Sequence, residues 1–229
     1  MIEFRDVTLQ YHYEQYPLLK GVSFTLSDGI NTVLADTQSG KSSLCKLLTK
    51  DVKPTGGEIF VDGLPLKSIT NAHLGILYLP SSPTFFGNRS VRYNIEYPLR
   101  VRKVSKAERR AKVEQIAARL NIHCLDVKLA TLSVKERKLI ALARGLTVER
   151  KVVLFDDFFQ TDGWESTDRI DGVLEMFANA TCVILTSDKS QALGNTVVLD
   201  GGVTAYVGDA AGAVEVINGL QWLNDSIKE

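Results

Sequence analysis

The chain has 229 residues, which is enough to bury a sizeable core as one domain or as one domain with an additional lobe. Basic and acidic residues both number 27, so no overall field attracts nucleic acid or an anionic membrane, and any anion site must be local. The three cysteines are widely spaced and form no CxxC pair, which disfavours a disulfide framework or zinc site and favours a reducing compartment. No apolar run approaches the roughly 18 residues that span a bilayer, and we expect no signal sequence.

The first part of the chain has the pattern of strands followed by a strand, a loop and a helix. Apolar residues alternate over residues 2–11 and 22–26, before Asp28-Gly29 predicts a turn. A buried strand at 32–34 then opens through residues 39–43 onto a helix that ends near Lys50. Residues 58–63 predict a short hairpin, and residues 75–79 predict another buried strand.

The second part predicts a helical lobe and then an alternating α/β pattern. Between residues 89 and 120 the apolar spacing is helical, and basic residues are frequent on the predicted surface. They form a solvated face or, as a less favoured alternative, bind an acidic partner. A helix follows Ser133 and runs to Thr147, so the lobe is expected at approximately residues 82–148. Strands at 152–155, 183–186 and 197–199 and a helix at 170–177 complete the pattern.

The segment Ser39-Gly40-Lys41-Ser42-Ser43 predicts a phosphate-binding loop. In such a loop backbone N–H groups at a helix N-terminus face the phosphates, a lysine reaches the β- and γ-oxygens, and a serine hydroxyl ligates Mg²⁺. The alternative, a chance Gly-Lys-Ser at a helix start, is disfavoured because both the strand and the helix are present. The motif is altered, since its first glycine is replaced by Ala35 and Asp36 puts a carboxylate near the phosphates.

Further motifs occur in one order along the chain. They are Tyr11, the segments 18–24, 54–59 and 62–63, the signature-like run Leu132-Ser133-Val134-Lys135-Glu136 followed by residues 141–144, the strand 152–155 with Asp156-Asp157, and the turn 200–202. With the phosphate loop they resemble the nucleotide-binding domain of ABC ATPases over nearly the whole chain. The resemblance implies an α/β P-loop NTPase of ABC type, with a RecA-like core, an antiparallel β subdomain and a helical subdomain. It implies a single nucleotide-binding domain over residues 1–229.

The resemblance also implies a role for each site residue. The nucleotide-binding set is Tyr11, which would stack on adenine, with Gln38, Ser39, Gly40, Lys41, Ser42 and Ser43. The metal set is Ser42, Ser81 and Asp156, the catalytic pair is Asp157 and Ser187, and the signature residues facing a partner's ATP are Ser133 and Lys135. From the residues alone, Tyr11 is equally a strand-surface aromatic, Asp156-Asp157 a turn or helix cap, and Cys45 a buried packing thiol.

Several positions depart from the family pattern. Asp157 replaces the glutamate that polarises the attacking water, and a base displaced by about 1 Å can lose roughly a hundredfold in rate. Ser187 replaces a histidine and Ser81 a glutamine. The signature keeps Ser133 but has lost both glycines and ends in Glu136, and the D-loop at Phe158-Phe159 and Asp162-Gly163 is also changed. We therefore expect slow hydrolysis.

The predicted function is that of the ATP-binding, energy-coupling subunit of an ABC transporter, using ATP and Mg²⁺. Its expected partners are a second nucleotide-binding subunit, identical or different, and a separate transmembrane permease, but no nucleic acid. It would be cytoplasmic and peripheral at the inner face of the membrane. Phe85 and Phe86 in the segment 83–87 would either anchor in the permease or be buried under the lobe. The alternative is a non-hydrolysing regulatory or structural subunit paired with an active ATPase.

Overall fold

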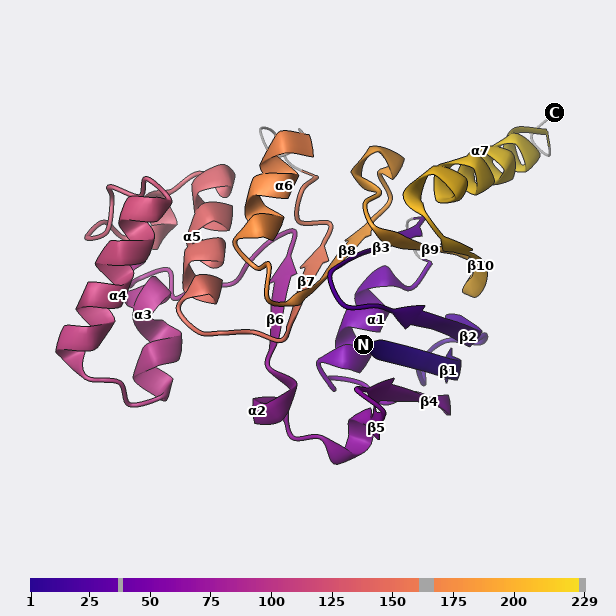
Figure 1. The fold of residues 1–229 in the computed structure, drawn as a ribbon, viewed down its shortest axis with the longest axis horizontal. Helices are drawn as coiled ribbons and strands as arrows, with labels where there is room; N and C mark the ends of the chain where they lie inside the picture. The colour runs from indigo at the N-terminus through magenta and orange to yellow at the C-terminus, as the bar shows by residue number, and fades with distance from the viewer. Residues whose placement is uncertain (37–38, 161–166, 227–229) are drawn as a thin grey trace.

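The computed structural model describes residues 1–36, 39–160 and 167–226. The strands are β1 (Ile2–Leu9), β2 (Leu19–Leu26), β3 (Ile30–Ala35), β4 (Gly56–Val61), β5 (Leu64–Pro65), β6 (Ile76–Pro80), β7 (Val152–Asp156), β8 (Thr181–Thr186), β9 (Asn195–Asp200) and β10 (Val203–Gly208). The helices are α1 (Lys41–Leu48), α2 (Asn71–Leu74), α3 (Val91–Val101), α4 (Lys106–Arg119), α5 (Val134–Leu146), α6 (Thr167–Glu175) and α7 (Ala210–Ser226), and Figure 1 shows their arrangement.

The larger sheet of the described residues has six strands in the order β10-β9-β3-β8-β7-β6. All neighbours are parallel except β10, which pairs antiparallel with β9 at the edge. Every residue of β7 and β8 is buried, because elements cover both faces of these central strands. Since β8 lies between β3 and β7, the loops after these three strands leave the sheet at one edge, and that edge carries the candidate site.

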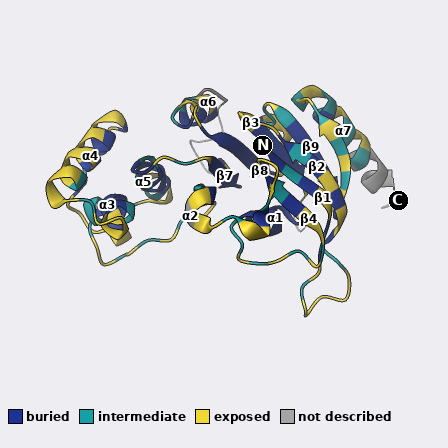
Figure 2. Cartoon of the chain, turned by 60° about the horizontal axis from the view of Figure 1, so that its bottom comes forward, coloured by how far each residue is buried: buried dark blue, intermediate teal, exposed yellow. Residues whose placement is uncertain are grey.

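A second sheet is antiparallel, in the order β2-β1-β4-β5. Its inner face, α1 and one face of the larger sheet share one apolar core, in which Phe4 stacks on Phe24 with ring centroids 4.4 Å apart. Figure 1 shows α1 between the two sheets, and Figure 2 shows that burial is concentrated in the strands and in α1. This packing fixes the N-terminus of α1 at the carboxyl edge of the large sheet.

Helices α3, α4 and α5 form a region set to one side of the sheets, at the left of Figure 1. They enclose a core of their own that includes Val91, Ile95, Val113 and Ile140. Both α4 and α5 begin with a capping box, in which a serine and a glutamate three residues later satisfy each other's backbone N–H groups. Figure 2 shows that the outer face of α4 is exposed, as its charged sequence predicts.

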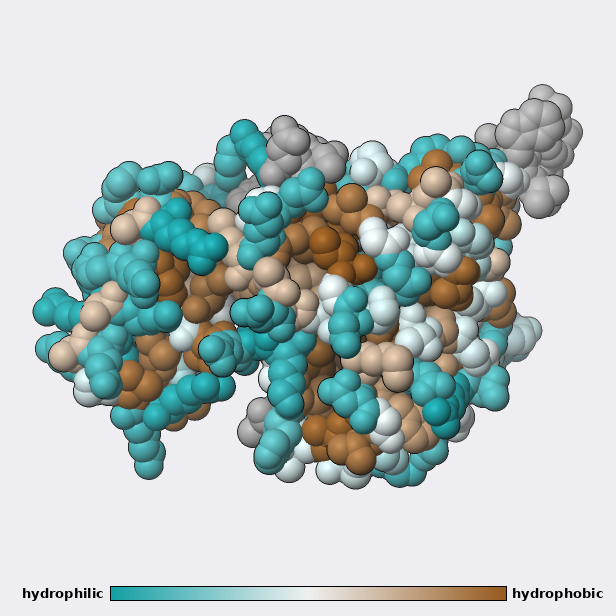
Figure 3. Space-filling model, in the orientation of Figure 1, coloured by the Kyte–Doolittle hydropathy of each residue, from teal (hydrophilic) through white to brown (hydrophobic). Residues whose placement is uncertain are grey.

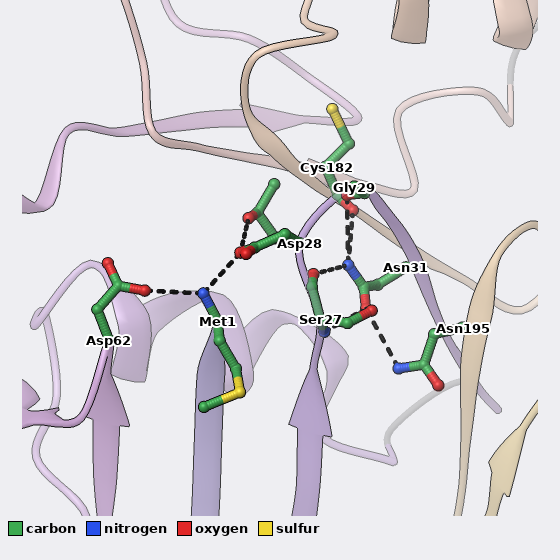
Figure 4. A network of polar contacts seen from close by, with 9 residues as sticks. Met1, Ser27, Asp28, Gly29, Asn31, Asp62, Cys182 and Asn195 are labelled. Atoms are coloured by element: carbon green, nitrogen blue, oxygen red, sulfur yellow. Dashed lines mark hydrogen bonds and ion pairs between the residues drawn. The ribbon is translucent and has the colours of Figure 1, made fainter.

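A polar network fixes the amino end of β3 (Figure 4). The side chain of Asn31 is fully buried; it accepts a hydrogen bond from the Ser27 backbone at 2.8 Å and another from Asn195 at 3.2 Å. Beside it, the N-terminal amine contacts Asp28 at 2.7 Å and Asp62 at 2.8 Å. These contacts join β1, β3, β9 and the turn after β4 at the end of the sheet opposite the candidate site.

The predicted order of elements is confirmed, with shifted boundaries. The strand expected over residues 2–11 ends at Leu9, and the hairpin expected from residue 58 begins at Gly56, because β4 pairs along β1. The helix expected over 170–177 is α6, and its last residues form a turn instead. Strand β10 and helix α7 were not predicted, because β10 is an edge strand whose alternate residues are exposed and α7 has little amphipathic pattern.

Candidate functional site

The N-terminus of α1 is built to leave backbone N–H groups open. Gly40 precedes the helix with φ of 94°, a left-handed conformation, and a Cβ on Gly40 would lie 2.8 Å from the Leu19 side chain. Among the described residues no side chain caps this helix, and its first turn contains no acidic residue. The positive end of the helix dipole and its unpaired donors therefore face outward, as an anion requires.

Lys41 lies inside the loop rather than in solvent. Its side chain is only 6% exposed, and Nζ donates hydrogen bonds to the Ala35 carbonyl at 2.6 Å and the Asp36 carbonyl at 3.1 Å. These carbonyls hold the ammonium at the carboxyl end of β3, beside the open end of α1. If a phosphate oxygen reached this point, Lys41 Nζ would donate to it instead of to a carbonyl. The new contact would be charge-assisted.

A hollow of about 600 Å³ opens in front of α1, lined by Lys41, Ser42, Ser43, Asp157 and a group of tyrosines. We call it the Tyr11 hollow. The Tyr11 hydroxyl lies 3.1 Å from Ser43 Oγ, and the Tyr11 ring stacks on that of Tyr13 with centroids 5.4 Å apart. Tyr13 is 80% exposed, so a base entering the hollow would meet an open aromatic face. The wall residues Tyr13 and Tyr16 were missed from the sequence, although the repeated tyrosines of residues 11–16 were the available signal.

Asp156 ends β7 and is 5% exposed. Its Oδ2 accepts a hydrogen bond from the Tyr78 hydroxyl at 2.8 Å, while its buried Oδ1 has no partner in the described part of the chain. Burial, and then this hydrogen bond, raise the pKa of Tyr78, so the phenol remains a donor. Cys45 packs nearby as a buried thiol, and burial raises its pKa well above the ordinary value, with Asp156 and Asp157 adding to the effect.

Asp157 and Ser187 come together at the same edge. Asp157 adopts φ of 47° and its backbone N–H donates to the Leu185 carbonyl at 2.9 Å. Burial raises the pKa of Asp157, while nearby Lys41 and the backbone N–H of Ser187 act in the opposite direction. Its buried Oδ1 has no partner in residues 1–36, 39–160 and 167–226. Gln160, which the sequence did not single out, donates to Ser187 Oγ at 3.0 Å.

Two buried carboxylate oxygens therefore point to no protein donor beside an open helix end. Hard cations such as Mg²⁺ take oxygen ligands, and Mg²⁺ is bound by one or two carboxylates together with substrate phosphates. Asp156, Asp157 and the Ser42 hydroxyl supply that donor set, so these residues fit the ion. Ser81 follows β6, whose last residue pairs with Asp156, but its exposed side chain makes no hydrogen bond within the described ranges.

Lys138 is a buried residue that the sequence did not single out. It lies on α5 and is fully buried, with Nζ donating to the Phe158 carbonyl and lying 5.1 Å from the Phe158 ring centroid. Burial lowers its pKa, and the charge of Asp157 opposes that change. The side chain thus joins α5 to the turn that follows Asp157. The available signal was a charged residue among apolar positions of a helix.

The predicted signature residues lie away from the Tyr11 hollow, at the start of α5. Ser133 is the N-cap, and its backbone N–H and Oγ both donate to Glu136 Oε2, at 2.8 Å and 2.7 Å. These hydrogen bonds lower the pKa of Glu136, so its carboxylate is ionised at neutral pH. Lys135 is exposed beside it. The positive end of α5 is therefore already next to a carboxylate of this chain.

Other predicted positions have mixed outcomes. Gln38 and the D-loop residues Asp162 and Gly163 lie outside the described residues. Phe85 is partly buried between two cores, with the Arg144 guanidinium 4.6 Å from its ring centroid, so it is not an exposed anchor. Phe86 is 43% exposed and lies against Tyr93 and Tyr97, at centroid distances of 5.7 Å and 4.7 Å. In the described ranges no helix combines the length and apolar character of a membrane span.

Known proteins resemble this chain in sequence. A family model described as ABC transporter matches residues 19–160. The molybdate/tungstate import ATP-binding protein WtpC of Methanocaldococcus jannaschii is 31% identical over 175 residues, covering 76% of this chain and 59% of that protein. The sn-glycerol-3-phosphate import ATP-binding protein UgpC 1 of Rhizobium johnstonii is 28% identical, covering 86% and 56%. The chain thus spans little more than half the length of these relatives.

The fold has a solved counterpart. A bacterial Atm1-family ABC exporter with ATP bound superposes with a TM-score of 0.79 at 22% identity, covering 93% of this chain and 40% of that one. This likeness identifies the fold as an α/β P-loop NTPase. Because the family model covers more than half of the sequence, the chain belongs to the ABC transporter family.

Proposed function

We propose that the chain is the ATP-binding, energy-coupling subunit of an ABC transporter and binds Mg-ATP in the Tyr11 hollow. The observation that carries this proposal is the open N-terminus of α1, with Lys41 beside it and two unpartnered carboxylate oxygens opposite. The loop N–H groups, Lys41 and Ser43 would bind the phosphates, and the Tyr11 and Tyr13 rings would stack on the base. Asp156 and Ser42 would hold Mg²⁺, whose chemistry is to neutralise phosphate charge and orient the terminal phosphoryl group.

Calorimetric titration with Mg-ATP tests the proposal. A charge-assisted hydrogen bond contributes roughly 1.5–3 kcal/mol, so Lys41→Ala should weaken affinity about tenfold or more. Lys20→Ala, an exposed lysine on β2, is the matched control and should bind as the wild type does. Equal affinity of the wild type and Lys41→Ala, or no binding by either, would refute the proposed site.

The proposed turnover is slow. Asp157 is one methylene shorter than the family's glutamate, so its carboxylate would reach less far toward an attacking water, and it lies beside the backbone N–H of Ser187. Restoring Asp157→Glu and Ser187→His together should raise kcat more than the sum of the single changes, because groups that act as a unit are non-additive. A wild-type kcat on the order of 1–10 per second, the ordinary enzyme range, would overturn slow turnover.

The proposed partners are a second nucleotide-binding subunit and a transmembrane permease, which would hold the chain at the cytoplasmic face of the membrane. The exposed aromatic group of Phe86, Tyr93 and Tyr97 suits a contact with the permease. The relatives named as import proteins support import. Phe86→Ala should weaken co-purification with a permease while leaving ATP affinity unchanged. Undiminished co-purification would count against this contact.

One observation favours the alternative of a non-hydrolysing regulatory subunit paired with an active ATPase. Glu136 occupies the N-terminus of α5, the place from which the family resemblance would offer a signature to a partner's ATP. Such a chain would bind nucleotide at its own phosphate loop and contribute little to a partner's site. ATP turnover by the purified chain, measured alone and with a second nucleotide-binding subunit, distinguishes the energy-coupling subunit from the non-hydrolysing regulatory subunit.

A further inference from the structure

A second hollow, of about 880 Å³, lies between the C-terminal half of α4, the segment joining α5 to β7, and the turn after α6. It lies at the amino ends of β6 and β7, whereas the Tyr11 hollow lies at the carboxyl edge of the same sheet. Figure 3 shows the surface hollowed between the helical region and the rest of the molecule, with hydrophilic residues along the rim. The proposed nucleotide site does not use it.

Cations dominate the lining of this hollow. Five basic side chains line it: Arg102, Lys112, Arg119, Arg150 and Lys151. The carboxylates among its lining residues are Glu149 and Glu175. The local excess is therefore three positive charges in a chain whose basic and acidic residues are equal in number. We call this site the basic hollow.

The basic side chains here lack the partners that arginines have elsewhere in the helical region. Arg92 is paired with Glu114 and Asp126, and Arg100 and Arg109 are both paired with Glu96. None of the basic side chains of the hollow forms an ion pair within residues 1–36, 39–160 and 167–226. All these residues belong to the same helices and links. The basic hollow differs because its lining has fewer carboxylates than basic side chains.

Arg150 is the most constrained member of the hollow. Its Nε is buried and has no acceptor in the described part of the chain. Burial lowers the pKa of Arg150, and the positive charge of Arg102 lowers it further, so the two guanidinium groups are close enough to repel. A buried donor without a partner and two neighbouring like charges both destabilise the folded chain, and an oxyanion between the guanidinium groups would remove both penalties.

The rest of the lining is partly apolar, and His73, Gln115 and Asn179 add neutral polar side chains to it. Ile116, Val148 and Phe177 are buried at its floor, with exposed fractions of 6–7%. A concave site of a few hundred Å³, with apolar walls and a few convergent polar groups, is typical of small-molecule binding. We propose that the basic hollow binds a small multivalent oxyanion that carries phosphate or carboxylate groups. This site is separate from the proposed nucleotide site and goes beyond the proposed function.

The experiment titrates inorganic phosphate and citrate by calorimetry into the full chain at low ionic strength. Each anion is tested against the wild type and Lys41→Ala, and then, in the Lys41→Ala background, against the double variant Arg102→Gln/Arg150→Gln and against Arg110→Gln. Lys41→Ala removes the phosphate loop as a competing site, and Arg110 is an exposed arginine of α4 outside the hollow. The anion that binds more tightly identifies the chemical class.

We expect binding by the wild type and by Lys41→Ala, at least tenfold weaker binding by the double variant, and no change in Arg110→Gln. The anion should also raise the melting temperature of Lys41→Ala but not that of the double variant in the same background. If Arg150→Gln fails to fold, Arg102→Gln/Arg119→Gln, which changes two exposed side chains, takes its place. The proposal is overturned if neither anion binds the wild type, if binding is lost in Lys41→Ala, or if the double variant and Arg110→Gln behave alike.

Discussion

Two helices of this chain, α1 and α5, present their N-termini in opposite ways. Helix α1 begins after Gly40 with no side-chain cap and no acid in its first turn among the described residues. Helix α5 begins with a complete capping box, in which the Glu136 carboxylate accepts both donors of Ser133. Both helix ends attract negative charge. The first is left for an anion from outside, and the second is filled by the chain itself.

Only one of the two helix ends is therefore open to a ligand from outside. The open end of α1 lies beside Lys41, and the hollow in front of it is lined by Lys41, Ser42 and Asp157. The filled end of α5 lies elsewhere and already has the negative charge it needs. Each prediction below changes one side of this comparison.

The largest effect is expected from closing the open end with a methyl group. Gly40→Ala places an L side chain at φ of 94° and a Cβ 2.8 Å from the Leu19 side chain. The left-handed conformation alone costs about 1–2 kcal/mol, and the loop would shift to relieve the contact. Urea denaturation should show that loss, and ATP binding should fall well below that of Lys41→Ala.

Gly172→Ala is the control for this substitution. Gly172 lies inside α6, and a Cβ there meets nothing within 4 Å. The change should stabilise the chain by roughly 0.5–1 kcal/mol, as expected for alanine in a helix, and leave ATP binding unchanged. A Gly40→Ala protein as stable and as active in binding as the wild type would contradict the account of α1.

The next effect concerns the charge beside the open end. The pKa of Asp157 is raised above the ordinary 3.8 by burial, so the folded chain holds this proton over a pH window in which the unfolded chain has lost it. The contribution of Asp157 to stability therefore falls as pH rises through that window, and the penalty is complete above the raised pKa. Asp157→Asn should raise the melting temperature at neutral pH.

The pH profile provides the check on Asp157. The stability difference between Asp157→Asn and the wild type should shrink as pH falls and vanish below the ordinary aspartate pKa, because both forms are then neutral. Added Mg²⁺ and ATP should reverse the order at neutral pH by stabilising the wild type. An asparagine variant that is less stable than the wild type at neutral pH without ligand would argue that Asp157 has a charged partner.

A smaller effect is expected at Tyr78, which holds one oxygen of Asp156 and leaves the other open. Tyr78→Phe removes one hydrogen bond, worth about 1 kcal/mol or roughly fivefold. The variant should therefore need a higher Mg²⁺ concentration than the wild type to bind ATP tightly. Its ATP affinity in excess chelator should be unchanged. Tyr97→Phe, on the exposed aromatic group, is the control. An equal loss with and without Mg²⁺ would make Tyr78 a packing residue only.

The smallest effect on stability is expected at the filled end. Glu136→Gln keeps the side-chain acceptor of the capping box but removes its charge, and Glu108→Gln makes the same change in the matching box of α4. Both should cost a few tenths of a kcal/mol. Only Glu136→Gln should increase ATP-dependent dimerisation, measured by light scattering. Equal behaviour of the two variants would show that Glu136 is a helix cap and nothing more.

The loop between β3 and α1 and the position of Asp156-Asp157 at the end of β7 could be predicted because their signals are local. A strand, a glycine, a lysine and a helix that follow one another directly leave few other arrangements, and two carboxylates at a strand end follow the same rule. The capping box at Ser133 and Glu136 was also readable from its spacing, although the sequence was interpreted only as a damaged signature.

Residues that act through tertiary register could not be predicted in the same way. The contact of Tyr78 with Asp156 depends on the pairing of β6 with β7, and the burial of Lys138 depends on how α5 packs against the turn after Asp157. The basic hollow joins Arg102, which follows α3, with residues of α4, of the link before β7 and of the turn after α6, and no sequence period connects them. Strand β10 lacked an inward apolar pattern, so edge pairing rather than burial determines it.

Amide hydrogen exchange with and without Mg-ATP compares the two helix ends in a single experiment. In the isolated chain we expect slower exchange over residues 40–44 at the start of α1 and no change over residues 133–137 at the start of α5. Protection at α5 instead of α1, or at neither helix under conditions where ATP is bound, would contradict this expectation.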